Sequence, residues 1–236
     1  MEFWVFFTAK PLFWLIITIV VFVCSVALNK RAGGSPLLHP VLVALSLIIV
    51  FLLLTKTSYE TYFEGAQFIH FLLGPATVAL AVPLYDHFER VRQMWLPLLV
   101  SCLVGAITAI VTVLAVGMFF DLPVGALLSL APKSVTSPIA IGIAEKIGGF
   151  PSLAAGLVLI TGAMGCLLAP MLFTLLKVDD DAVKGFSMGL AAHGFGTASA
   201  FEISALAGAF SGLAMGMTGL LTAFILPVVV SMFGLI

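Results

Sequence analysis

Charged side chains are scarce in this sequence, and their scarcity decides its class. Lys, Arg, Asp and Glu supply 9% of the 236 residues, whereas 62% are hydrophobic. Soluble domains carry roughly 25% charged residues. A net charge of -1 leaves no basic face for nucleic acid. The charged side chains are too few to cover a water-exposed surface. We therefore predict an integral membrane protein with the lipid bilayer as its main partner.

Paired metal ligands and cysteines are also missing. Cys24, Cys102 and Cys166 stand singly in apolar stretches, so we interpret them as packing residues rather than disulfide or zinc ligands. We expect no metal, no cofactor and no enzyme activity. The opening segment Met1 to Thr8 lacks a basic region, which predicts an uncleaved first span.

Long hydrophobic runs are what the sequence does contain. A spanning helix needs about 20 apolar residues, and six stretches qualify: 11–28, 37–55, 67–85, 94–120, 152–176 and 211–233. Two further apolar stretches, 122–147 and 182–209, are broken by polar, Gly or Pro residues. The pattern predicts an all-α polytopic membrane protein with about six full spans and two interrupted elements, forming one membrane domain over residues 1–236.

The basic residues predict the orientation of the spans. Lys30 with Arg31, and Arg90 with Arg92, occupy the first and third loops. The positive-inside rule makes those loops cytoplasmic and leaves the N-terminus outside.

The two interrupted stretches resemble each other. Residues 121–156 and 181–216 align at an offset of 60 with 11 identities in 36 positions, among them Asp121/Asp181 and Phe150/Phe210. We therefore divide the chain into N-terminal spans (1–120), repeat 1 (121–176) and repeat 2 (181–236). If the interrupted elements cross the bilayer the copies are parallel, and if they are re-entrant hairpins the copies are inverted. Loop charges slightly favour the hairpins.

The first break, residues 130–139, gathers one cation and three hydroxyls: Lys133, Ser134, Thr136 and Ser137. Ser137 followed by Pro138 is a helix-start signal, a hydroxyl cap before a proline. A half-helix starting there would point its free N–H groups at an anion. The alternative is a surface loop with Lys133 reaching the lipid headgroups.

The second break matches the first in kind. In the repeat register His193 lies opposite Lys133, and Thr197 lies opposite Ser137. Gly194 and Gly196 would permit unusual backbone conformations. The unperturbed pKa of a histidine lies near neutral pH, so His193 is a candidate for proton coupling, with a packing histidine as the alternative.

Ser199 and Glu202 follow the second break at the spacing of a capping box, which predicts a half-helix beginning there. Glu202 is thus either a cap or a second candidate for proton coupling.

Four segments resemble the LrgB/CidB family of bacterial membrane proteins. They are residues 73–85, 129–139, 147–151 and 192–197, including the specific Pro-Lys-Ser-Val-Thr run. Many members carry a basic residue where this chain has Ser199. An anion contact from a basic side chain at that position is therefore not expected here. The resemblance implies either an antiholin-like or holin-like regulator of murein hydrolase activity and autolysis, or a transporter of small carboxylates. It also implies an LrgA/CidA-type partner, a homo- or hetero-oligomer, and a place in the bacterial cytoplasmic membrane.

The interrupted, duplicated helices favour transport over a holin-type pore. We predict a secondary transporter, or its transporting subunit, for monocarboxylates such as pyruvate, glycolate or glycerate. A scaffolding subunit is a third reading that the sequence leaves open. The expected substrate-binding residues are Lys133, Ser134, Thr136, Ser137, His193, Gly194, Gly196 and Thr197.

Overall fold

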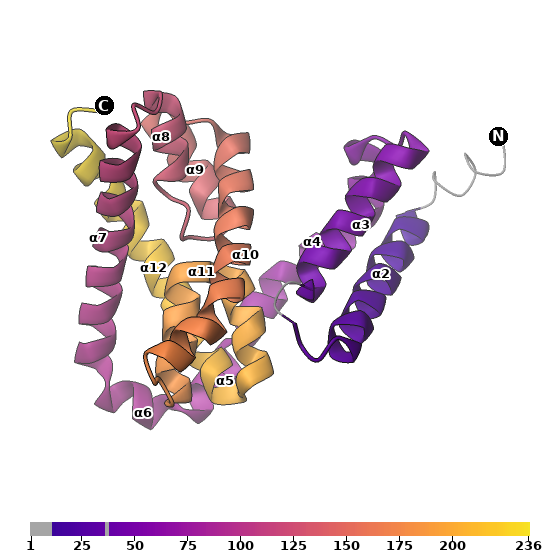
Figure 1. The fold of residues 1–236 in the computed structure, drawn as a ribbon, viewed down its shortest axis with the longest axis horizontal. Coiled ribbons are helices and arrows are strands. Elements are labelled where there is room, and N and C mark those ends of the chain that lie inside the picture. The colour runs from indigo at the N-terminus through magenta and orange to yellow at the C-terminus, as the bar shows by residue number, and fades with distance from the viewer. Residues whose placement is uncertain (1–10, 36–37) are drawn as a thin grey trace. The chain divides into compact units, whose positions relative to one another are not determined.

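The described residues, 11–35 and 38–236 of a computed structural model, are helical without any strand (Figure 1). The helices are α2 (Pro11–Arg31), α3 (Pro40–Thr55), α4 (Tyr59–Ala79), α5 (Ala81–Asp86), α6 (Phe88–Gln93), α7 (Trp95–Phe119), α8 (Val124–Leu130), α9 (Ser137–Ile147), α10 (Pro151–Leu175), α11 (Asp181–Ile203) and α12 (Ala205–Met232). Met1 to Thr8, for which we predict an uncleaved start, lies outside the described residues, as does residue 37 at the start of the second predicted span.

Five segments of the described chain are long and apolar enough to span a bilayer: Leu12–Arg31, Tyr59–Asp86, Trp95–Phe119, Pro151–Leu175 and Ala205–Met232. The apolar helix Pro40–Thr55 is shorter. Each of the six predicted spans thus has its helix, and the prediction of an all-α polytopic membrane protein is confirmed. Cys102 and Cys166 are buried as predicted, whereas Cys24 is exposed on α2.

Contacts divide the chain into two compact units, one ending at Ala79 and the other formed by Leu80–Ile236. In the first unit α2 packs against α3 and α4. Trp14 is buried between them, with edge contacts to the rings of Phe51 and Tyr62. The Thr18 and Tyr62 hydroxyls lie 3.0 Å apart and tie α2 to α4.

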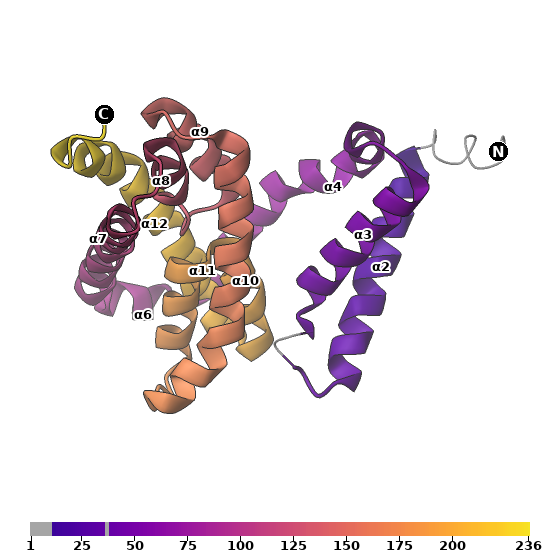
Figure 2. The same cartoon turned by 45° about the horizontal axis from the view of Figure 1, so that its top comes forward.

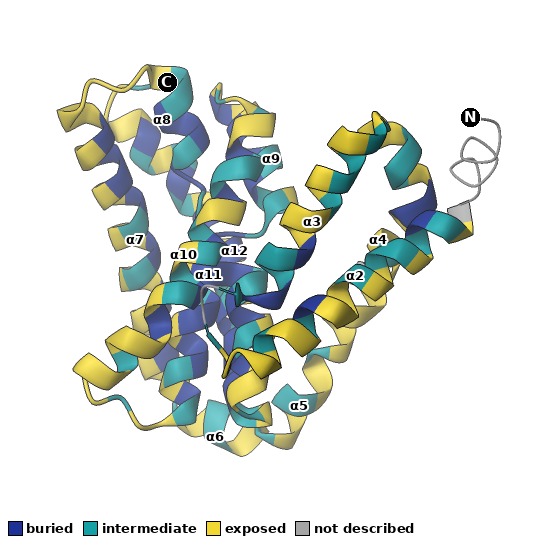
Figure 3. Ribbon diagram, turned by 45° about the vertical axis from the view of Figure 1, so that its right-hand side comes forward, coloured by how far each residue is buried: buried dark blue, intermediate teal, exposed yellow. Residues whose placement is uncertain are grey.

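The second unit holds the two interrupted elements together with α7, α10 and α12. Its buried residues are concentrated where these helices meet (Figure 3). The largest apolar cluster joins α7, α8, α9 and α12 through Leu114, Leu127, Ile143 and Leu226. The interrupted elements are therefore part of the core.

The first interrupted element, residues 124–147, is a helical hairpin made of α8, a turn and α9 (Figure 2). The Phe150 N–H, just past the end of α9, donates to the Ser129 hydroxyl of α8 at 2.7 Å. A Cβ on Gly149 would lie 2.9 Å from the Ser129 nitrogen, so glycine is needed for this close approach. The chain consequently enters and leaves this first hairpin at one end of the unit.

The second interrupted element, α11, is also a hairpin. Its helical path breaks at Ala192 and His193, which have non-helical φ and ψ. Gly185 faces Ala207 and Gly189 faces Ser211, so the first arm of α11 runs parallel to α12 and starts at the same end. Because α12 begins two residues after α11 ends, the second arm must return to that end.

The two hairpins enter from opposite ends of the unit, because the 25-residue helix α10 separates them. The α9 arm of the first hairpin has 11 residues. The first arm of the second hairpin, residues 181–191 before the break in α11, also has 11. At about 1.5 Å per residue each arm is roughly 16 Å long, about half of a 30 Å hydrocarbon core. The turns of the hairpins are therefore brought toward each other near the middle of the unit.

Candidate functional site

Both hairpin turns contact the same residue of α10. We call residues 131–136 the first tip and residues 192–197 the second tip. Val135 of the first tip belongs to one buried cluster with Val158 of α10. His193 of the second tip is bonded through Nε2 to the Val158 carbonyl oxygen, at 3.0 Å. The pairing of Lys133 with His193 in the repeat register thus corresponds to two turns that meet on one residue.

The first tip carries polar groups without partners. Pro132, Ser134 and Val135 are buried, while Lys133 and Thr136 are half-buried. Within the described part of the chain, the Lys133 ammonium forms no ion pair. The Ser134, Thr136 and Ser137 hydroxyls likewise have no hydrogen-bond partner there.

The start of α9 is also uncapped. Its N-cap is Thr136, whose side chain makes no capping bond, and a proline occupies the first turn. The predicted helix start is confirmed, but the prediction of Ser137 as the cap is off by one residue, because Ser137 already has helical geometry. Backbone N–H groups at this end consequently point into the tip without a side-chain acceptor.

The second tip is held together by hydrogen bonds. The Val158 carbonyl only accepts, so His193 carries its proton on Nε2. The ring fits because Gly162 has no side chain: a Cβ there would lie 2.8 Å from His193 Cε1. Thr197 donates to the His193 carbonyl at 2.9 Å, and its hydroxyl lies 3.1 Å from that of Ser211 on α12.

The glycines of the second tip serve a purpose other than the predicted one. The left-handed φ of this turn, 43°, belongs to His193 and not to Gly194 or Gly196. Gly196 instead allows the two arms to touch, because a Cβ there would lie 2.2 Å from the Met188 carbonyl oxygen. Gly194 faces open space, with no atom within 4 Å of its Cβ position.

The predicted capping box is wrong. Ser199 and Glu202 lie inside the second arm of α11, whose helix has already begun after the break. Ser199 donates to the Cys166 sulfur at 3.4 Å, and the cap of the next helix is Ser204, which accepts from the Ala207 N–H. Glu202 is exposed near the base of the hairpin, one residue before α11 ends.

Three residues that shape the site were not predicted: Val158, Gly162 and Ser211. Nothing in the sequence distinguishes Val158 and Gly162 from the rest of their uninterrupted apolar span. Val158 acts through its backbone carbonyl, and Gly162 acts by having no side chain. Ser211 is a hydroxyl at the edge of an apolar run, which is a usable signal. No group of three or more His, Cys, Asp or Glu residues suited to a metal ion occurs among the residues the structure describes.

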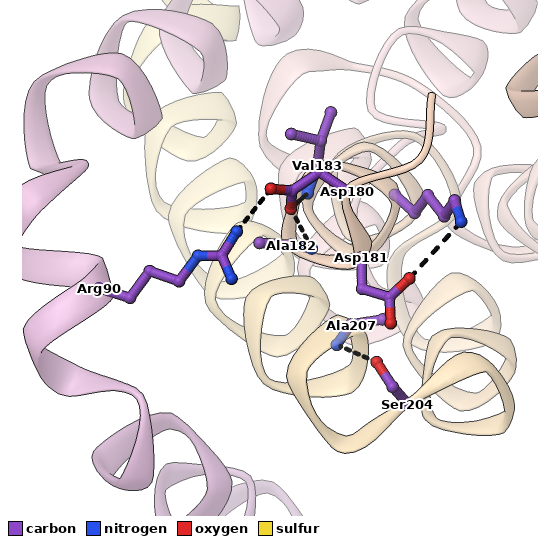
Figure 4. A network of polar contacts seen from close by, with 8 residues as sticks. Arg90, Asp180, Asp181, Ala182, Val183, Ser204 and Ala207 are labelled. Atoms are coloured by element: carbon purple, nitrogen blue, oxygen red, sulfur yellow. Dashed lines mark hydrogen bonds and ion pairs between the residues drawn. The ribbon is translucent and has the colours of Figure 1, made fainter. Parts of the chain in front are cut away.

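The base of the second hairpin is held by ionic contacts (Figure 4). Arg90 of α6 pairs with Asp180, which also accepts from the Ala182 and Val183 N–H groups as the N-cap of α11. Partial burial raises the pKa of Asp180, but the two backbone bonds and the Arg90 charge outweigh it and lower the pKa overall. Arg90 and Lys184 thus lie at the end of the unit that the positive-inside rule predicts to be cytoplasmic.

The model of the LrgB-like family matches residues 18–232. The chain belongs to the LrgB-like family. Membership confirms the resemblance drawn from the sequence, and it agrees with a multi-pass membrane protein.

Individual relatives cover nearly the whole chain. Uncharacterized protein YxaC of Bacillus subtilis is 36% identical over 93% of this chain and 95% of its own length. Antiholin-like protein LrgB of Bacillus mycoides is 29% identical over 96% of this chain and 99% of its own. No solved structure matches the chain.

Proposed function

We propose that this LrgB-like protein is a secondary transporter, or the transporting subunit of one, for small monocarboxylates such as pyruvate, glycolate or glycerate. It would act in the bacterial cytoplasmic membrane together with an LrgA-type partner, without enzyme activity. One observation carries the proposal: an unpaired lysine and an uncapped helix start occupy a turn that meets a second turn on Val158.

The first tip has the chemistry of an anion site. A lysine at the bilayer centre costs about 2.5 to 3.5 kcal/mol, and no carboxylate of the described chain offsets that cost for Lys133. A bound carboxylate would pair with the ammonium and accept from the hydroxyls and from free N–H groups of α9. Two- and three-carbon acids are small enough to need only these few donors.

The arrangement of the hairpins supports an inverted repeat. Gly125 and Gly185 are equivalent at the offset of 60, and each lies on the first arm of its hairpin against the start of the following long helix. Because α10 runs between the hairpins, the two copies point in opposite directions. Such repeats allow a central site to be exposed to each side in turn.

His193 is our first candidate for proton coupling. Its Nε2 proton is used by the Val158 carbonyl, and its Nδ1 atom makes no hydrogen bond within the described structure. A proton arriving at Nδ1 would add charge to the second tip without breaking the Val158 bond. Glu202 remains a second candidate, less well placed because it lies at the hairpin base.

The test is uptake of labelled pyruvate, glycolate and glycerate into proteoliposomes, with and without an LrgA-type partner. We expect uptake of at least one acid, and loss of substrate-dependent thermal stabilisation in Lys133→Ala. Lys184→Ala, which removes a lysine at the base of the second hairpin, is the matched control and should keep that stabilisation. Folded protein that shows no uptake above empty liposomes, with the partner present, would rule transport out.

A second function is favoured by the printed names of relatives. Several Bacillus relatives are called antiholin-like protein LrgB. In an antiholin-like role this chain would regulate murein hydrolase activity and autolysis with its partner. Lysis rates that change with expression of the wild type and of Lys133→Ala alike would favour this direct role, because anion binding would then be dispensable.

A further inference from the structure

A cavity of about 240 Å³ lies between the first hairpin and α12. Its α9 side includes Pro138, Gly142 and Lys146, and its α12 side includes Ala223 and Pro227. Pro138 belongs to the first turn of α9 at the first tip, and Lys146 is one residue from the other end of that helix. The cavity therefore follows α9 from near the end of the unit inward to the first turn of α9, which directly follows the first tip.

We infer that this cavity is the outer entry path by which a small carboxylate reaches the first tip, with Lys146 as the residue that attracts it. The inference rests on the proposed function. It adds the route of the substrate, the side of the membrane from which it enters, and the positive charge that selects an anion. The path opens at the end opposite to Arg90 and Asp180, which is the non-cytoplasmic end by the positive-inside rule.

Charge complementarity is the first argument. Lys146 is the only charged residue lining the cavity, is exposed, and forms no ion pair among the described residues. The inner end of the cavity meets the uncapped start of α9, where the helix dipole is positive. An anion is thus attracted at both ends of the path and meets no acidic lining residue between them.

Space is the second argument. A Cβ added to Gly142, halfway along the path, would meet no atom within 4 Å. The contact between α9 and α12 is open here, whereas the α11 and α12 backbones touch at Gly185 and Gly189. A two- or three-carbon acid occupies less than the cavity volume, so the cavity can hold one.

An apolar groove could instead hold a lipid acyl chain. The two occupants can be distinguished by charge, because a path for carboxylates should favour an anionic reagent and a lipid groove should not. In a Cys24→Ser background, whose remaining cysteines are buried, Gly142→Cys is treated with thiosulfonate reagents of equal size and opposite charge. We expect the anionic reagent to react on the order of tenfold faster, and Lys146→Glu to reverse the preference. Gly156→Cys, also next to open space but outside the cavity, should show no such reversal.

Equal rates for both reagents at Gly142→Cys, unaffected by Lys146→Glu, would overturn the inference in favour of a lipid groove. Transport supplies the second measurement. Gly142→Leu should cut carboxylate uptake at least tenfold while Gly156→Leu retains it, and neither should alter folding because neither Cβ meets a neighbour.

Normal uptake by Gly142→Leu would also overturn the inference, with the proposed function intact. Absence of uptake by the wild type would instead remove the proposed function. The charge preference in labelling would then still report whether the cavity admits anions.

Discussion

The two tips occupy equivalent places in the repeat but differ in how their polar groups are used. In the second tip, His193 and Thr197 are buried and bonded to α10 and α12. In the first tip, Lys133, Ser134 and Thr136 have no partner in the described chain, and neither does the hydroxyl of Ser137, which follows the tip. The polar groups of the second turn are thus satisfied internally, whereas those of the first turn are not. Changes in the second tip should affect folding, whereas changes in the first should affect binding.

The largest expected effect extends the comparison from the tips to the hairpin arms and uses a matched pair of glycines. Gly185→Ala would place its Cβ 1.9 Å from the Ala207 carbonyl oxygen, a backbone atom that cannot move aside. We expect destabilisation of about 3 kcal/mol or more, measured as a lower thermal unfolding temperature in detergent. At the equivalent Gly125 the nearest atom belongs to the exposed Phe150 ring, 2.8 Å away, which can rotate. Gly125→Ala should cost far less, and equal losses would break the comparison.

His193→Ala tests the satisfied tip directly. It removes the bond to Val158 and leaves alanine in a left-handed conformation that favours glycine. We expect a loss of about 1 to 3 kcal/mol in the free energy of unfolding. His193→Asn, which keeps an N–H donor, should lose less. A His193→Ala variant as stable as the wild type would show that the second tip is not held by this bond.

Lys133→Met is the corresponding change in the open tip. It removes an unpaired, half-buried charge and keeps the apolar stem, so stability without substrate should be unchanged or higher by up to about 1 kcal/mol. Stabilisation by added pyruvate or glycolate should disappear in the same unfolding assay. A large loss of stability without substrate would mean that Lys133 has a structural partner, and the two tips would then be alike.

The smallest expected effect concerns the base of the second hairpin. The pKa of Asp180 is lowered in the folded protein, so its stabilising contribution is present at neutral pH and is lost as pH falls below about 4, the range of an ordinary aspartate. Because Arg90 and Asp180 are both partly exposed, the pair contributes no more than about 1 kcal/mol.

Asp180→Asn preserves the cap through its amide oxygen but loses the charge. Its unfolding temperature should therefore fall less than that of the wild type between about pH 6 and pH 3. Identical pH profiles for the two proteins would show that the ion pair does not hold the hairpin base.

Hydropathy and the repeat were sufficient to predict the helices and to locate both tips. Apolar length alone marks the spans, because a bilayer demands it, and the offset of 60 aligns Lys133 with His193 before any coordinates are known. The Ser137 and Pro138 signal predicted the start of α9 to within one residue, since proline fixes the first turn locally.

Tertiary contacts explain what the sequence did not predict. The capping box at Ser199 and Glu202 failed because α11 resumes directly after His193. The left-handed residue is His193 rather than a neighbouring glycine, since its ring is held by Val158 and fits over Gly162. Both contacts join residues more than 30 positions apart, so local propensity carries no information about them.

The direct backbone contact that glycines allow between α11 and α12 also limits how these two helices can move against each other. At Gly185 and Gly189 backbone meets backbone, with no layer of side chains that could switch rotamers to absorb sliding. In the proposed transporter, the second hairpin and α12 would therefore move together. Shear that exposes the site would then fall along α9, where Gly142 has open space beside it.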